Sequence, residues 1–186
     1  MIIVYDIMLK VRRWNMPNYK EDIQYMNIIR HIINNEDFMV LKDVKHHNIT
    51  RLDHSLKVSY YSYKISKLLH LGYEETARAG LLHDFYLEQI DEQEKIKDKI
   101  LLFSTEHPKT AVNNSLKYFD LSDKEIDIIK THMFPSSFAI PKYMESWIVS
   151  IVDKFVSTKE FGYKFHQRLL LAKTYLYVLV VVSFFK

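Results

Sequence analysis

The sequence predicts an all-α protein, built as a single-domain helical bundle, and three observations support this. Residues that form turns are rare, because the 186 residues include three Gly and four Pro, which favours helices joined by short connections. Apolar residues recur at helical spacing in several segments. Capping patterns, in which Ser or Thr precedes an acidic residue by three positions, indicate where two helices begin.

Three helices are expected in the first half of the chain. The first lies within residues 18–35, where the apolar residues fall at helical spacing: Ile23, Met26, Ile29 and Ile33. The second follows Thr50, whose side chain can cap its first turn, and Gly72 is expected to close it. The third covers the segment YEETARAGLLHDFYLEQ, residues 73–89.

Further helices are expected in the second half. One begins near Pro108, because proline fits the first turn of a helix. The next follows Ser122, with Glu125 in the capping-box position, and it ends before Pro135. Another begins near Pro141 and continues through the segment SWIVSIVDKF.

The composition restricts the classes of function. The chain is 48% hydrophobic and carries a net charge of +3 with His neutral, and its basic residues form no concentrated stripe, so nucleic acid is not expected as a partner. The absence of Cys excludes disulfides and thiolate metal sites. The N-terminal segment MIIVYDIMLKVRRW does not read as a signal peptide, and a cytoplasmic location is expected.

Histidine and aspartate recur at intervals of about one helix and one connection. Asp84 follows His83 in an apolar stretch, where a carboxylate is costly to bury unless a partner neutralises it. The other members of the series are His54, His107, His132 and Asp153, in steps of 21 to 29 residues. Antiparallel helices can bring such residues to one level of a bundle core. Four imidazoles and two carboxylates suit Fe, Mn, Ni or Zn.

The pattern HS…GLLHD…EHP…THMFP…SIVDK resembles that of the HD-domain metal-dependent phosphohydrolases. The resemblance covers residues 47–160 and implies an HD-type helical bundle there, between an N-terminal helical or irregular extension (1–46) and an apolar C-terminal helix or tail (161–186). The core signature of the superfamily corresponds to His54, His83, Asp84 and Asp153. His107 and His132 correspond to the two further histidines of its two-metal branch, which includes bacterial dinucleoside polyphosphate hydrolases and cyclic dinucleotide phosphodiesterases.

The resemblance also implies a metal-dependent mechanism. Two divalent transition-metal ions are expected, Fe or Mn in the first place, with Ni or Zn as alternatives. His54, His83, Asp84 and Asp153 would hold the first ion, and Asp84, His107 and His132 the second. Asp84 is the expected catalytic residue, because it would bridge the two ions around the hydroxide that attacks phosphorus.

The expected substrate is a small phosphorylated molecule of the nucleotide type, cleaved at a phosphate ester or anhydride. Three basic residues lie near the ligands and are candidates for binding its phosphates: Arg51, Lys57 and Lys154. Arg51 resembles an arginine of the dinucleoside polyphosphate hydrolases, with a surface salt bridge as its alternative role. Leu87 stands where many relatives have lysine, and the Gly-Tyr-Pro motif of the cyclic di-GMP enzymes is missing. Both differences count against a cyclic dinucleotide.

Several alternatives stay open at this point. The protein could be a regulatory module that binds metal and nucleotide without turnover, or a membrane-associated adaptor. From Thr174 to Phe185 the tail has no charged residue, but this run is shorter than the roughly 20 residues that span a bilayer. A core helix or a homodimer interface is the preferred interpretation of the tail, ahead of a membrane-surface anchor. The tyrosines of residues 59–64 could pack in the core or stack on a nucleobase.

Overall fold

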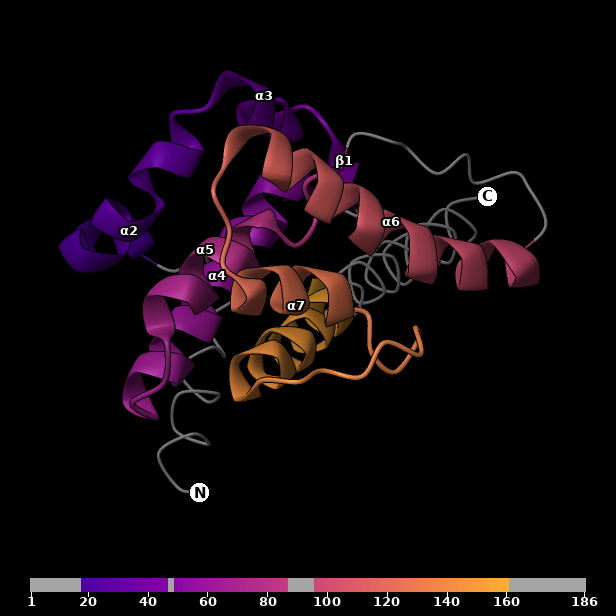
Figure 1. Cartoon of the computed structure of the whole chain (residues 1–186). Coiled ribbons are helices and arrows are strands. Elements are labelled where there is room, and N and C mark those ends of the chain that lie inside the picture. The colour runs from indigo at the N-terminus through magenta and orange to yellow at the C-terminus, as the bar shows by residue number, and fades with distance from the viewer. Residues whose placement is uncertain (1–17, 47–48, 87–95, 161–186) are drawn as a thin grey trace, which may run out of the picture.

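Helices dominate the computed structural model, which describes residues 18–46, 49–86 and 96–160 (Figure 1). The prediction of an all-α fold is confirmed. The helices are η1 (Tyr19–Glu21), α2 (Ile23–Ile33), α3 (Glu36–Met39), η2 (Val40–Lys42), α4 (Arg51–Leu68), α5 (Tyr73–Leu82), α6 (Ile96–Tyr118) and α7 (Asp123–Thr131), and a further helix covers residues 144–160. Two short antiparallel strands, β1 (Lys45–His46) and β2 (Ile49–Thr50), precede α4. The expectations for the tail and for Leu87 lie outside the described residues.

Helix α4 begins where the sequence predicts and ends differently. The Thr50 hydroxyl accepts a hydrogen bond from the Asp53 amide at 3.1 Å, which confirms the expected cap. Gly72 does not close α4; it is the N-cap of α5 and has a φ of −68°. His70 takes the left-handed conformation instead, with a φ of 57°. The Leu71 amide then reaches back to the carbonyl of Ser66 at 2.9 Å, as in a Schellman motif.

Small residues allow α4 and α5 to pack closely. Serines form a buried stripe along α4: Ser55, Ser59, Ser62 and Ser66. Within it, Ser59 donates a hydrogen bond to the carbonyl of Ala77 on α5 at 2.6 Å. A Cβ atom added to Gly80 of α5 would lie 3.1 Å from the Ser59 Cα. This close approach fixes the position of His83, just after α5, relative to His54 on α4.

Helix α2 covers the other side of this pair. Its buried face is formed by Tyr25, Ile29 and Ile32, while Ile23 is 75% exposed, so the prediction that Ile23 belongs to the apolar face is wrong. Ile23 lies two residues before Tyr25 and therefore points to the opposite side of the helix. The Tyr25 hydroxyl donates to Ser59 at 2.8 Å. Tyr63 is fully buried, in line with core packing of the tyrosine run.

Helix α6 is longer than the sequence predicts. It begins at Ile96, so Pro108 lies inside it, and the prediction of a start near Pro108 is wrong. Proline removes one backbone donor, but this single loss does not end the helix. At α7 the predicted capping box is present, because Ser122 accepts from the Glu125 amide while Glu125 accepts from the Ser122 amide.

The helix over residues 144–160 is held against two neighbours by Glu145 in its first turn. This buried carboxylate accepts hydrogen bonds from the Gly72 amide at 2.9 Å and from the Lys124 ammonium at 3.1 Å. Burial alone would raise the pKa of Glu145, but these bonds lower it. Figure 1 shows this helix beside α7, whose Asp127 accepts from Ser146 at 2.7 Å. Among the described residues, no helix combines the length and apolar character needed to cross a membrane.

The close contact between α4 and α5 can be tested with Gly80→Val. The branched side chain would meet the α4 backbone, and overpacking of this kind lowers the free energy of unfolding by about 1–3 kcal/mol. Glu74→Val places the same residue at an exposed position of α5 and serves as the control. Urea denaturation of both variants provides the measurement. Equal losses in the two variants would contradict a tight contact at Gly80.

Candidate metal centre

The structure brings all six predicted metal ligands together in the interior. None of the six residues is more than 7% exposed. They come from five helices or helix ends: His54 on α4, His83 and Asp84 directly after α5, His107 on α6, His132 directly after α7, and Asp153 on the helix over residues 144–160. Residues separated by up to 99 positions therefore meet at one point, as the spacing along the sequence predicts.

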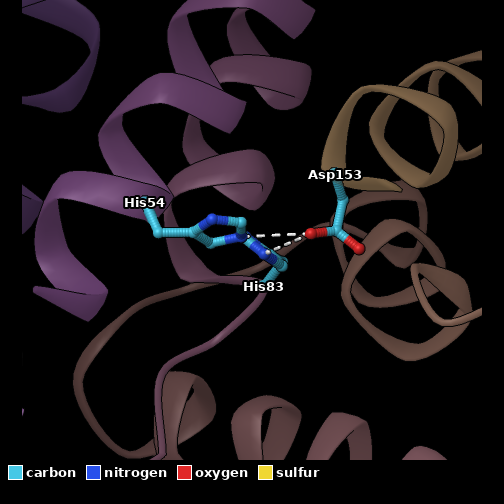
Figure 2. A group of neighbouring side chains, drawn as sticks. All are labelled: His54, His83 and Asp153. Atoms are coloured by element: carbon cyan, nitrogen blue, oxygen red, sulfur yellow. Dashed lines mark hydrogen bonds and ion pairs between the residues drawn. The ribbon is translucent and has the colours of Figure 1, made fainter. Parts of the chain in front are cut away.

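One group of ligand atoms lies between α4, α5 and the helix that carries Asp153 (Figure 2). The Asp153 Oδ1 atom is 3.1 Å from His54 Nε2 and 3.7 Å from His83 Nε2. Asp84 Oδ2 is 3.7 Å from the same nitrogen of His83. The potential ligand atoms of His54, His83 and Asp153 lie within 4.8 Å of one another, which is compatible with one shared cation.

A second group of ligand atoms, those of His83, Asp84 and His132, also lies within 4.8 Å of one another, with His107 close by. The Asp84 Oδ1 atom is 3.7 Å from His107 Nε2 and 3.6 Å from His132 Nε2. The two imidazole nitrogens are 3.0 Å apart. The two oxygens of one carboxylate therefore face different groups of side chains, Oδ2 towards His83 and Oδ1 towards His107 and His132.

His83 and His132 are positioned by the same local structure. Each is the C-cap of its helix, where the last carbonyls lack helical partners. His83 Nδ1 lies 2.8 Å from the Gly80 carbonyl, and His132 Nδ1 lies 2.7 Å from the Ile129 carbonyl. A carbonyl can only accept, so Nδ1 carries a proton in each residue, and in the neutral imidazole Nε2 then presents a lone pair. The predicted helix over residues 73–89 thus ends earlier, at Leu82.

The donor set fits a cation. His83 Nε2 is buried and has no hydrogen-bond partner within the described part of the chain. Its lone pair instead faces two carboxylate oxygens, which are also acceptors. An unsatisfied buried polar atom of this kind costs about 1–3 kcal/mol, and a positive ion among these acceptors removes the mismatch. The nitrogen and oxygen ligands suit a transition metal.

The protonation states also favour metal binding. Burial would raise the pKa of Asp84, but the surrounding histidines lower it well below its usual range. Burial and the neighbouring histidines lower the pKa of His132 to about 3. At neutral pH the carboxylate is therefore ionised and His132 is neutral, which are the forms that bind metal. His54 differs: burial lowers its pKa, but hydrogen bonds with Asp153 and Glu160 outweigh this and raise the pKa to about 10, so a metal ion would have to displace a proton from this imidazole.

Glu160 also belongs to this region, and no pattern in the sequence predicts it. The residue is 2% exposed. Its Oε2 atom lies 3.1 Å from His54 Nδ1, and its Oε1 atom accepts from the Lys57 ammonium at 3.2 Å. His54 and Glu160 are 106 positions apart, and a Glu near the end of a helix has no spacing that distinguishes it from a solvated one.

The three predicted phosphate-binding residues all lie near the ligands. Arg51 is buried; its guanidinium stacks 3.7 Å from the centre of the Tyr86 ring and donates to the Tyr86 carbonyl. Lys57 is buried against Glu160. Lys154 donates to the His132 carbonyl at 2.7 Å and to the Ser150 hydroxyl at 3.1 Å. Binding of substrate phosphate by these residues stays a prediction.

Comparison with known proteins adds no assignment: no family model matches the chain, and no curated protein or solved structure matches it either.

Metal content tests this centre. Protein purified without chelator is expected to carry close to two transition-metal ions per chain. Asp84→Ala should lose most of both ions, because it removes the side chain that faces both groups, while His132→Ala should lose mainly one. Elemental analysis provides the measurement, with the exposed His31→Ala as the control. Wild-type protein that stays metal-free after incubation with Fe, Mn, Ni and Zn would show the assignment to be wrong.

Proposed function

We propose that this protein is a metal-dependent phosphohydrolase, a member of the two-metal branch of the HD-domain enzymes, which cleaves a phosphate ester or anhydride in a nucleotide-like substrate. One observation carries the proposal: the two oxygens of the buried Asp84 carboxylate face different histidines, Oδ2 towards His83 and Oδ1 towards His107 and His132. A carboxylate shared in this way is typical of two-metal hydrolytic sites.

The ligands divide between two ions in this proposal. His54, His83, Asp84 and Asp153 would hold one ion, and Asp84, His107 and His132 the other. Iron or manganese is the proposed metal, and nickel or zinc would also suit this donor set. Bound divalent ions supply a water molecule of lowered pKa and stabilise negative charge on phosphoryl oxygens.

The residues of the chain have distinct parts in this reaction. Asp84 remains ionised because the surrounding histidines lower its pKa. Its negative charge would therefore be available to both ions. The helix ends after α5 and α7 hold His83 and His132 with Nε2 directed at Asp84, which removes the need to reorganise the site when the substrate arrives.

Lys154 is the basic residue best placed to bind substrate phosphate. Its side chain is 35% exposed, whereas those of Arg51 and Lys57 are buried. The ammonium lies 3.9 Å from Asp153 Oδ2, at the edge of the ligand cluster. Partial burial lowers the pKa of Lys154, which reflects incomplete hydration that an anionic substrate would compensate.

Hydrolysis can be tested with the metal-loaded protein and a panel of nucleoside mono-, di- and triphosphates, dinucleoside polyphosphates, cyclic dinucleotides and sugar phosphates. Release of phosphate or nucleotide is expected from at least one compound, with dinucleoside polyphosphates or simple nucleotides above cyclic dinucleotides.

Asp84→Ala should abolish turnover. Lys154→Met should raise KM about 10-fold or more, since a hydrogen bond to a charged group contributes roughly 1.5–3 kcal/mol.

The exposed Lys159→Met is the matched control for the lysine variant, and it should leave KM unchanged. Tight binding of a nucleotide by fully loaded protein, with no turnover of any compound, would identify a regulatory binding module instead. A preference for cyclic dinucleotides would contradict the proposed order of substrates.

A further inference from the structure

A line of polar side chains connects the helix over residues 144–160 with α4. On the first helix, Asp153, Ser157 and Glu160 occur at intervals of four and three residues and therefore share one face. The Ser157 hydroxyl donates to Asp153 Oδ1 at 3.4 Å. On α4, His54 and Lys57 are three residues apart and lie opposite this face.

His54 lies between two carboxylates from that helix. Asp153 Oδ1 is 3.1 Å from His54 Nε2, and Glu160 Oε2 is 3.1 Å from His54 Nδ1. The second oxygen of Glu160 accepts from the Lys57 ammonium at 3.2 Å. The side chains of His54, Glu160 and Lys57 are buried, with at most 6% of each exposed.

We propose that Glu160 is a positioning residue for the metal ligand His54, and that Lys57 is the counter-ion of Glu160 and not a ligand of the substrate. The inference rests on the metal centre of the proposed function. Glu160 accepts a hydrogen bond from Nδ1–H of His54, which leaves Nε2 of the neutral ring to bind a metal ion beside Asp153. Lys57 neutralises the charge that Glu160 brings into the interior.

Two other candidate ligands, His83 and His132, are also positioned through Nδ1, but by neutral acceptors. The carbonyls of Gly80 and Ile129 accept hydrogen bonds from Nδ1 of His83 and His132. His54 lies in the first turn of α4, and there a carboxylate from another helix, that of Glu160, is the acceptor for Nδ1. A charged acceptor increases the basicity of the ligand more than a carbonyl does. Loss of Glu160 should therefore weaken the ion that His54 binds.

A purely structural role for Glu160 makes a different prediction. If the ion pair with Lys57 only joins two helices, apolar residues of similar size can replace it, since such replacements of buried ion pairs are often neutral or stabilising. The double variant Lys57→Met/Glu160→Met tests this, because it removes the ion pair and the acceptor of His54 together. Glu160→Gln is the milder variant, which keeps an acceptor of similar shape but removes its charge.

The experiment titrates Co²⁺ into metal-free protein, with calorimetry for affinity and visible absorption for the ligand environment. We expect the affinity for one ion to fall about 10- to 100-fold in the double variant, with a changed absorption band, while the second ion binds as in the wild type. Glu160→Gln should show a smaller loss at the same ion. Glu125→Gln is the matched control, because Glu125 is also buried, pairs with Arg78 and contacts no metal ligand among its described partners.

The results separate this inference from the proposed function. Wild-type protein that binds no Co²⁺ would overturn the metal centre and, with it, the role of Glu160. Wild-type protein that binds two ions, with equal affinities in a folded double variant, would leave the centre intact and overturn the positioning role. If thermal unfolding shows that the double variant does not fold, Glu160→Gln decides: unchanged affinity for both ions, or a loss no larger than in Glu125→Gln, overturns the proposal.

Discussion

Burial of the Asp84 carboxylate is the constraint on which the centre of this protein depends. A carboxylate at 5% exposure needs compensation that the apolar core cannot give. The structure provides it through histidines from several helices, with His83 on the side of Oδ2 and His107 and His132 on the side of Oδ1. Positive charge added among these imidazoles and the carboxylates of Asp84 and Asp153 would balance the cluster. A pair of metal ions provides that charge in our proposal.

The ends of α5 and α7 position two candidate metal ligands, His83 and His132. The last carbonyls of a helix lack partners, and the carbonyls of Gly80 and Ile129 accept hydrogen bonds from the histidine that follows each helix. One contact therefore satisfies the helix end and selects the tautomer of the histidine. Close packing of α4 on α5, permitted by Gly80 and Ser59, then sets the position of His83 against α4.

Much of this arrangement was predictable from local sequence. Helix caps such as Thr50 follow from contacts three residues apart, and the six candidate ligands follow from their regular intervals. The end of α4 at His70 was not predictable, because a non-glycine residue in the left-handed conformation has no clear signal. The start of α6 at Ile96 was not predicted because proline is much more common in the first turn of a helix than in its interior. Glu160 was missed because its partners are distant in sequence.

The most direct test of the central claim is the electron paramagnetic resonance spectrum of the protein loaded with two Mn²⁺ ions per chain. If Asp84 connects two ions, the spectrum should show a magnetically coupled pair. Asp84→Ala, titrated with the same amount of Mn²⁺, should show isolated or free ions instead. A spectrum of isolated ions in fully loaded wild-type protein would contradict the shared role of Asp84.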